Sequence, residues 1–99
     1  MRVRLAQSAE EDLIGIADWI GRDNPVRAAS FVNELHARCL SLAHRPKRFP
    51  IARTVHGVPI RKLAYRDYLI FYAIGADSVD VIRIFHGARQ WRLLLDEDQ

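Results

Sequence analysis

The sequence predicts an α+β fold in which an N-terminal strand and an antiparallel helical hairpin pack on a small antiparallel sheet. Two stretches in the first half carry apolar residues at helical spacing, and the second half carries strand-like apolar runs separated by turn residues. A chain of 99 residues has room for one hydrophobic core. We therefore expect residues 1–99 to form a single βααβββ domain that ends in a short helix or tail.

The first strand and the first helix are predicted from local patterns. Arginines alternate with apolar residues over positions 2–5, as in a short strand. Ser8 and Glu11 have the spacing of a capping box, in which two side chains bond to free backbone N–H groups at a helix start. Gly21 is suited to the left-handed conformation that closes many helices. A helix is therefore expected over residues 9–20.

The second helix has clearer boundaries. Asn24 is a good capping residue, and Pro25 fits the first helical position because its missing N–H would have had no partner there. Pro46 ends the pattern, since the residue before a proline is disfavoured in helical geometry. The apolar face between them is formed by Ala28, Phe31, Val32, Leu35, Cys39 and Leu42. Cys39 is therefore expected in the core and not as a nucleophile.

The second half predicts an irregular loop followed by strands. Residues 45–58 contain two prolines, a glycine and many cations, as in a basic loop. Strands are expected over residues 60–64, 68–74 and 79–85, with a turn at residues 75–78. Residues 88–95 are expected to form a short helix or an ordered tail.

Composition narrows the class of protein. The formal net charge is +3, with 49% hydrophobic and 27% charged residues, as in an ordinary folded domain. No long apolar run suggests a signal peptide or membrane span, and one cysteine cannot form an intrachain disulfide. We therefore expect a cytoplasmic protein. His36, His44 and His56 lack ligand spacing and no phosphate-binding loop is present, so neither a metal nor a cofactor is expected.

The middle of the chain is strongly basic. No acidic residue occurs between Arg45 and Arg66, and the last four residues are mostly acidic. The bases in this stretch are Arg45, Lys47, Arg48, Arg53, Arg61, Lys62 and Arg66. The stretch is either a solvated basic loop or a surface that attracts a polyanion or an acidic protein.

Two arginines are candidate functional cations on the predicted sheet. Period-two alternation places Arg83 on one strand face with Val79, Val81 and Phe85. Such a charge among apolar neighbours is either snorkelled or carboxylate-paired, or it is a fixed cation for a phosphate or carboxylate. Arg61 is a similar case, because it alternates with Lys62 along its predicted strand.

His86 and the aromatic residues allow two interpretations each. His86 at the strand end could act as an acid or base near neutral pH, or it could simply bond the strand end. The aromatic side chains could stack on bases or pack in the core, and core packing explains them more economically. They are Trp19, Tyr65, Tyr68, Tyr72 and Trp91.

Taken together in order and spacing, these features resemble the ParE branch of the RelE/ParE toxin superfamily over nearly the whole chain. The motifs are residues 8–13, then Asn24, Pro25, Ala28, Phe31 and Val32, then Leu42, Pro46, Phe49, Pro50, Gly57, Ile60 and Arg61, then residues 68–72 and 81–89. The resemblance implies a helical hairpin on an antiparallel sheet and a bacterial toxin with a role in growth arrest or plasmid stabilisation.

The resemblance also implies partners. A ParD-like antitoxin would form a tight hetero-oligomer with the chain, wrapping it with a C-terminal segment while its other half binds operator DNA. The chain itself would meet operator DNA only indirectly, through the antitoxin. The target implied for the ParE branch is DNA gyrase, through its A subunit, by binding without chemistry. An acidic antitoxin tail would suit the basic toxin.

The alternative activity in the superfamily is ribosome-dependent messenger RNA cleavage of the RelE type. Its catalytic residues here would be Arg61, Arg83 and His86, but no tyrosine follows Tyr72, so that set looks incomplete. An inert or diverged member kept for partner binding is a third interpretation. The ending at residues 86–89 favours gyrase inhibition.

On the gyrase interpretation, the contact surface combines the basic stretch with the C-terminal segment. The predicted target-binding residues are Arg61, Arg83, His86, Arg89, Trp91 and Arg92. Tryptophan and arginine are the residue types that dominate interface energetics. Trp91→Ala should then abolish toxicity and leave the fold intact, unless Trp91 belongs to the core.

Overall fold

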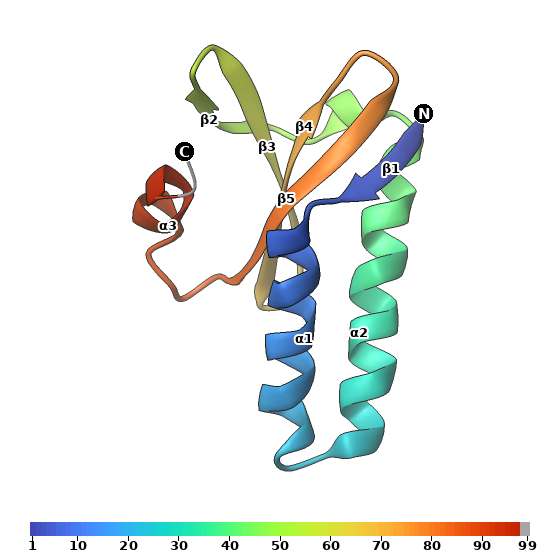
Figure 1. Ribbon diagram of the computed structural model, residues 1–99. Coiled ribbons are helices and arrows are strands. Elements are labelled where there is room, and N and C mark those ends of the chain that lie inside the picture. Colours follow the sequence, from blue (N-terminus) through green and yellow to red (C-terminus); the bar gives the residue numbers. More distant parts are fainter. Residues whose placement is uncertain (98–99) are drawn as a thin grey trace.

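A computed structural model describes residues 1–97 as a five-stranded sheet with helices on both faces (Figure 1). The elements in chain order are β1 (Arg2–Leu5), α1 (Gln7–Gly21), α2 (Pro25–Leu40), the 3-10 turns η1 (Ser41–Ala43) and η2 (Pro46–Arg48), β2 (Ile51–Val55), β3 (Val58–Tyr65), β4 (Tyr68–Ile74), β5 (Ser78–His86) and α3 (Trp91–Glu97). None of the helices in this part of the chain is long and apolar enough to span a membrane.

The predicted α+β class is confirmed, but the sheet is mixed. Its strand order is β1-β5-β4-β3-β2, and β1 runs parallel to β5 while the other neighbours are antiparallel. The predicted antiparallel sheet is present in β2–β5, and the N-terminal strand adds one parallel pair at its edge, which was not predicted. The parallel pairing follows from the long connection that leads from β1 through both helices and back to β5.

The prediction of an irregular loop over residues 45–58 was wrong in its second half. Strand β2 pairs with β3 across a tight turn at His56 and Gly57, whose φ angles of 50° and 81° lie in the left-handed region. Two left-handed residues are what a two-residue hairpin turn requires. The basic composition of the stretch concealed this short edge strand.

The start and end of α1 differ from the prediction. Ala6 is the N-cap and no side chain caps the helix, so the capping box at Ser8 and Glu11 does not form. The helix instead begins directly after β1, because the Ala6 N–H donates to the Val81 carbonyl at 2.8 Å. Gly21 is not left-handed, since the chain continues in helical geometry through Arg22.

The start of α2 is as predicted. The Asn24 side chain accepts the Arg27 N–H at 3.0 Å, and Pro25 occupies the first helical position. The helix ends at Leu40, earlier than expected, because the chain tightens into η1 before it reverses at Arg45, which has a φ of 53°. Strand β4 has the predicted bounds, and β3 and β5 extend slightly beyond theirs.

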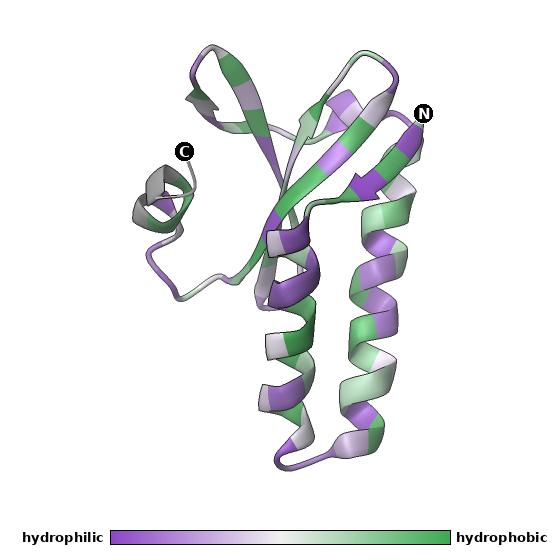
Figure 2. Cartoon of the chain, viewed as in Figure 1, coloured by the Kyte–Doolittle hydropathy of each residue, from purple (hydrophilic) through white to green (hydrophobic). Residues whose placement is uncertain are grey.

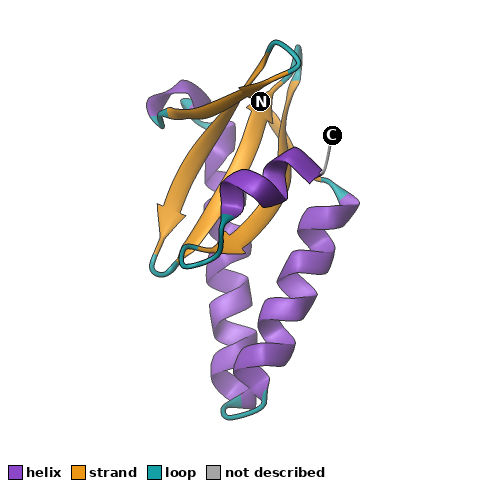
Figure 3. Cartoon of the chain, turned by 90° about the vertical axis from the view of Figure 1, so that its left-hand side faces the viewer, coloured by secondary structure: helices purple, strands orange, loops and turns teal. Residues whose placement is uncertain are grey.

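Two layers of apolar side chains hold the sheet between the helices. Helices α1 and α2 cover one face, and each turns its apolar side towards the sheet and its polar side outward (Figure 2). Helix α3 crosses the opposite face (Figure 3). The core of that second face is formed by Ile60, Phe71, Phe85, Trp91 and Leu95. Of the two alternatives predicted for the C-terminal segment, the short helix is the one present, and it begins at Trp91.

Strand β5 contains a bulge that the period-two pattern did not predict. Phe71 pairs with Arg83, but the next residue of β4 pairs with Val81, so Ile82 is an extra residue. A bulge reverses the alternation of side chains along a strand. As a result Val81 and Ile84 lie in the same core, and the prediction that Val79, Val81, Arg83 and Phe85 share one face was wrong.

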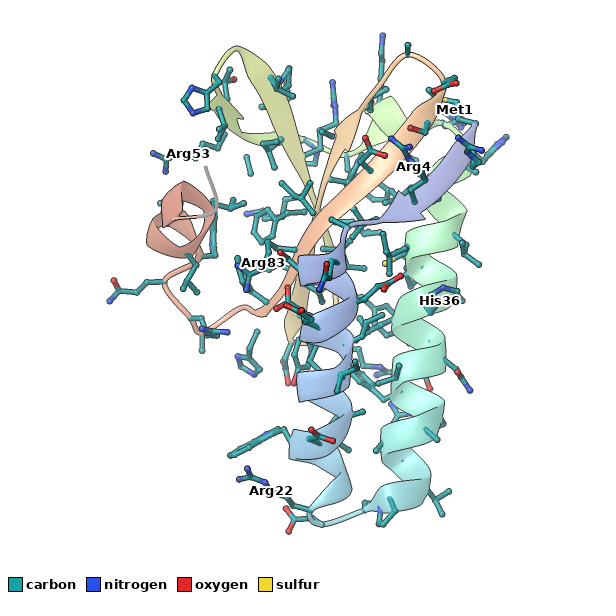
Figure 4. The ribbon with its side chains drawn as sticks, viewed as in Figure 1. Met1, Arg4, Arg22, His36, Arg53 and Arg83 are labelled. Carbon is teal, nitrogen blue, oxygen red and sulfur yellow. The ribbon has the colours of Figure 1, made fainter. Side chains whose placement is uncertain are left out.

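An ion pair closes the sheet edge beside this bulge. Strand β1 pairs with β5 only as far as Val81, so no described strand flanks β5 beyond it. Asp12 of α1 takes that place: its carboxylate accepts the Ile84 N–H at 2.8 Å and two bonds from the Arg83 guanidinium at 2.8 and 3.0 Å. Arg83 is labelled in Figure 4. The side chains of Arg83 and Asp12 are only 17% and 12% exposed.

We predict that Asp12→Ala strongly destabilises the fold, by about 3 kcal/mol, because it removes the carboxylate to which a largely buried guanidinium and a strand N–H both donate. Urea unfolding followed by circular dichroism measures the loss. The control is Arg4→Gln, which breaks the more exposed pair with Asp80 and should cost much less. Equal losses from the two variants would contradict this assignment.

Candidate protein-interaction site

A hollow of about 570 Å³ lies between α1 and the adjacent ends of β4 and β5, and we call it the α1–β5 groove. Four segments contribute to it: the outer side of α1, the start of β4, the end of β5 and the loop that follows. Its lining residues are Glu11, Asp12, Gly15, Ile16, Trp19, Tyr68, Ile84, His86 and Arg89. The groove thus joins residues that are far apart in the sequence.

The groove has an apolar floor and a charged rim. Ile16, Tyr68 and Ile84 form the floor and belong to the main core. Glu11 lies on the α1 side of the rim and Arg89 on the sheet side. Burial and the charge of the neighbouring Asp67 raise the pKa of the Tyr68 phenol, which therefore stays protonated and neutral. Such an apolar cleft with opposite charges on its two rims suits an amphipathic segment of another chain.

Trp19 is the exposed large apolar side chain of the groove. It is 64% exposed, and the Arg22 guanidinium lies 5.3 Å from the centroid of its ring. Ile14 on the same helix is 62% exposed. Large exposed apolar side chains beside a hollow commonly mark a surface that another molecule covers.

Gly15 leaves the wall of the groove open. A Cβ atom at this position would meet nothing within 4 Å, so packing inside the chain does not require a glycine. Glycine inside a helix costs about 0.5–1 kcal/mol relative to alanine. The glycine thus widens the groove at the expense of helix stability, which is consistent with a partner that approaches α1 closely.

His86 bonds the end of its strand. Its Nδ1 accepts the Ala88 N–H at 3.0 Å, and the ring meets Tyr68 edge-on with centroids 5.2 Å apart. The interpretation of His86 as a residue that bonds the strand end therefore matches the geometry.

The two candidate cations of the sheet also have structural bonds. Arg83 is the carboxylate-paired arginine of the first interpretation, since it is bonded to Asp12. Arg61 donates to the backbone carbonyls of Lys47 at 3.0 Å and Phe49 at 2.6 Å. The two guanidinium groups therefore hold different parts of the fold in place.

The other three predicted contact residues follow β5. Arg89 and Arg92 are exposed, and with Trp91 they line a second hollow. Trp91 is only 8% exposed and packs on Phe71 with ring centroids 5.0 Å apart. The structure thus gathers His86, Arg89, Trp91 and Arg92 along one segment, while Arg61 lies by a separate hollow with Lys47, Pro59 and Ile74.

Several residues of the groove were not among the predicted site residues. Glu11, Gly15, Ile16 and Trp19 come from α1, which the sequence presents only as a core-facing helix. The available signal was Trp19, a large apolar residue outside the stripe that faces the sheet. The position of α1 beside the open edge of β5 could not be read from that pattern.

Neither a metal cluster nor a reactive thiol is found among the described side chains, which leave out those of residues 93 and 96–99. No group of three His, Cys, Asp or Glu residues among them is placed to hold a metal ion. Cys39 is fully buried, and burial raises the pKa of its thiol to about 12. The predicted core position of Cys39 is confirmed.

Comparison with known proteins gives one family. The family model described as ParE toxin of type II toxin-antitoxin system, parDE, matches residues 3–91. Among solved structures, one described as the chromosomal ParDE TA system from P. aeruginosa is similar in fold, with a TM-score of 0.73 and 18% identity. The match covers 87% of this chain and 95% of that chain. No curated protein matches the sequence.

We predict that Trp91→Ala lowers the stability of the chain, by about 3 kcal/mol, because it empties part of the core on the α3 face of the sheet. Thermal unfolding measures this effect directly. A variant with an unchanged melting temperature would show instead that Trp91 is dispensable for folding and free for target contact. Arg92→Ala, at an exposed neighbour, is the control and should leave the melting temperature nearly unchanged.

Proposed function

The chain belongs to the ParE toxin family of type II toxin–antitoxin systems, and on that basis we propose that it inhibits DNA gyrase by binding and is neutralised by a ParD-like antitoxin. The family membership gives the class of protein. The gyrase target, its A subunit as the binding site and the ParD-like partner are our proposals, and the geometry of the candidate residues supports them.

The observation that carries the proposal is that all three residues that RNA cleavage would use already form hydrogen bonds within the fold. Arg83 bonds to Asp12, Arg61 bonds to two backbone carbonyls, and the Nδ1 atom of His86 accepts a backbone N–H. A general acid or base and its cations must reach the substrate in a common site. Residues with these separate structural bonds support a binding role over RelE-type cleavage.

We infer that gyrase contacts the segment from Arg83 to Leu95 together with the basic stretch. Arg89 and Arg92 are exposed on this segment, and their guanidinium groups lie over the rings of Phe85 and Trp91. Stacking on a buried ring restricts an arginine and lowers the entropy that it loses on binding. The Phe85 ring thus lies beneath Arg89 and the Trp91 ring beneath Arg92.

We place the antitoxin in the α1–β5 groove. The apolar floor and the exposed Trp19 supply the area that an amphipathic helix would bury. The rim charges indicate its orientation: a basic side chain opposite Glu11 and an acidic one opposite Arg89. The antitoxin would carry the contacts to operator DNA.

The proposed activity predicts that the purified chain inhibits supercoiling of relaxed plasmid by gyrase and traps cleaved DNA, and that antitoxin reverses the inhibition. The variant Arg89→Gln with Arg92→Gln should weaken inhibition at least tenfold, because it removes two exposed cations without emptying the core. Wild-type chain that leaves gyrase unaffected at high excess, but cleaves messenger RNA on ribosomes, would contradict the proposal.

The placement of the antitoxin in the groove predicts that a larger side chain at position 15 weakens antitoxin binding. Gly15→Leu should raise the antitoxin Kd at least about tenfold, or 1.4 kcal/mol, because the added side chain occupies the groove. Gly15→Ala is the intermediate case: it should stabilise the helix and weaken antitoxin binding less than Gly15→Leu, because its side chain fills less of the groove. Calorimetric titration with the antitoxin encoded upstream gives both values. Equal affinities for all three proteins would place the antitoxin elsewhere.

A further inference from the structure

A short turn between the helices and the sheet carries three exposed cations, which we call the cationic ridge: Arg45, Lys47 and Arg48. No acidic residue follows in the sequence until Asp67. The stretch that follows the ridge thus adds only positive charge, which attracts anions by long-range forces that salt weakens.

The backbone of the ridge is held from below by side chains of the sheet. The Tyr72 hydroxyl donates to the Pro46 carbonyl at 2.5 Å. Arg61 donates to the Lys47 and Phe49 carbonyls at 3.0 and 2.6 Å. An ordinary solvated loop bonds mainly to water, whereas the carbonyls of this one bond to the sheet. The cations consequently project from a fixed backbone.

Arg45 has an unfavourable backbone conformation. Its φ and ψ are 53° and 58°, in the left-handed region where glycine and asparagine are preferred. An arginine at this position costs conformational energy that a glycine would avoid. Strained residues of this kind gather at functional sites, which suggests that the charged side chain is itself in use.

We propose that the cationic ridge contacts the phosphodiester backbone of the DNA that gyrase holds. The proposal rests on the gyrase-binding function, and it assigns the Arg45–Arg48 part of the basic stretch to the nucleic acid of that complex and not to the gyrase subunit. Exposed arginine and lysine side chains are the usual partners of backbone phosphates. The neighbouring aromatic rings, Phe49 and Tyr72, are partly or fully buried and offer no surface for stacking on bases. The contact is therefore independent of base sequence.

The composition of the ridge favours a phosphate backbone over an acidic protein. Protein docking sites gain affinity from an apolar centre within a polar rim. The three exposed ridge residues are all charged, and Pro46 between them is partly buried. Binding to phosphates needs no such centre, because the release of condensed counterions supplies the free energy.

The first test measures the chain alone against a short fluorescein-labelled duplex of arbitrary sequence by anisotropy at several salt concentrations. Three phosphate contacts predict a slope of log K against log salt of about −2.7, at roughly 0.9 per phosphate. Lys47→Gln with Arg48→Gln should reduce the slope to about −0.9. The matched control, Arg2→Gln with Arg22→Gln, removes the same charge from exposed sites elsewhere and should keep the wild-type slope.

Two further variants separate charge from geometry. Tyr72→Phe removes the hydroxyl that holds Pro46 without changing the charge, and it should weaken DNA binding several-fold. Arg45→Gly should weaken DNA binding while the melting temperature does not fall, because glycine accepts the left-handed conformation. Equal loss of binding in the ridge variant and its matched control would overturn the proposal. Displacement of the duplex by polyglutamate as effectively as by unlabelled duplex would assign the ridge to an acidic protein.

A gyrase assay separates this inference from the proposed function. Wild-type chain should inhibit supercoiling, and the ridge variant Lys47→Gln with Arg48→Gln should inhibit at least tenfold less. Inhibition by both at the same concentration would overturn the ridge contact and leave the gyrase function standing. Wild-type chain without effect on gyrase would refute the proposed function, while the duplex-binding comparison would still decide whether the ridge binds phosphates.

Discussion

The carboxylate of Asp12 caps the part of the β5 edge that β1 does not cover. Strand β1 is short and pairs with β5 only over Ser78–Val81, after which the chain turns directly into α1. Beyond that point a side-chain carboxylate accepts the Ile84 N–H that a neighbouring strand would otherwise accept. Arg83 neutralises this carboxylate, and the two layers of the fold are joined at the bulge.

The Asp12–Arg83 ion pair bears on function because Arg83 was a candidate functional cation of the sheet. With Arg83 bonded to Asp12 and Arg61 bonded to the loop backbone, both sheet arginines form structural bonds, and the groove and the ridge are the surface features that stand out. Those surfaces differ in character. The α1–β5 groove is apolar with an acidic side, whereas the cationic ridge carries positive charge alone. A toxin with two such surfaces can bind an antitoxin on one and its target complex on the other.

The sequence was most informative where one local interaction decides the structure. The Asn24 cap, the bounds of β4 and the buried Cys39 all follow from patterns within a few residues. It was least informative where distant segments decide: the bulge at Ile82 depends on the register with β4, and the helix start at Ala6 depends on a bond to Val81. The groove was missed for the same reason, since packing alone brings α1 to the end of β5.

The most direct test of this account is a double-mutant cycle over Asp12 and Arg83, with the free energy of unfolding measured in urea for the wild type, Asp12→Ala, Arg83→Ala and the double variant. If the pair joins α1 to β5 as a unit, the two single losses are large and the double loss is smaller than their sum by about 2 kcal/mol. Losses that simply add would contradict the account, because they would show that the carboxylate and the guanidinium stabilise the fold independently.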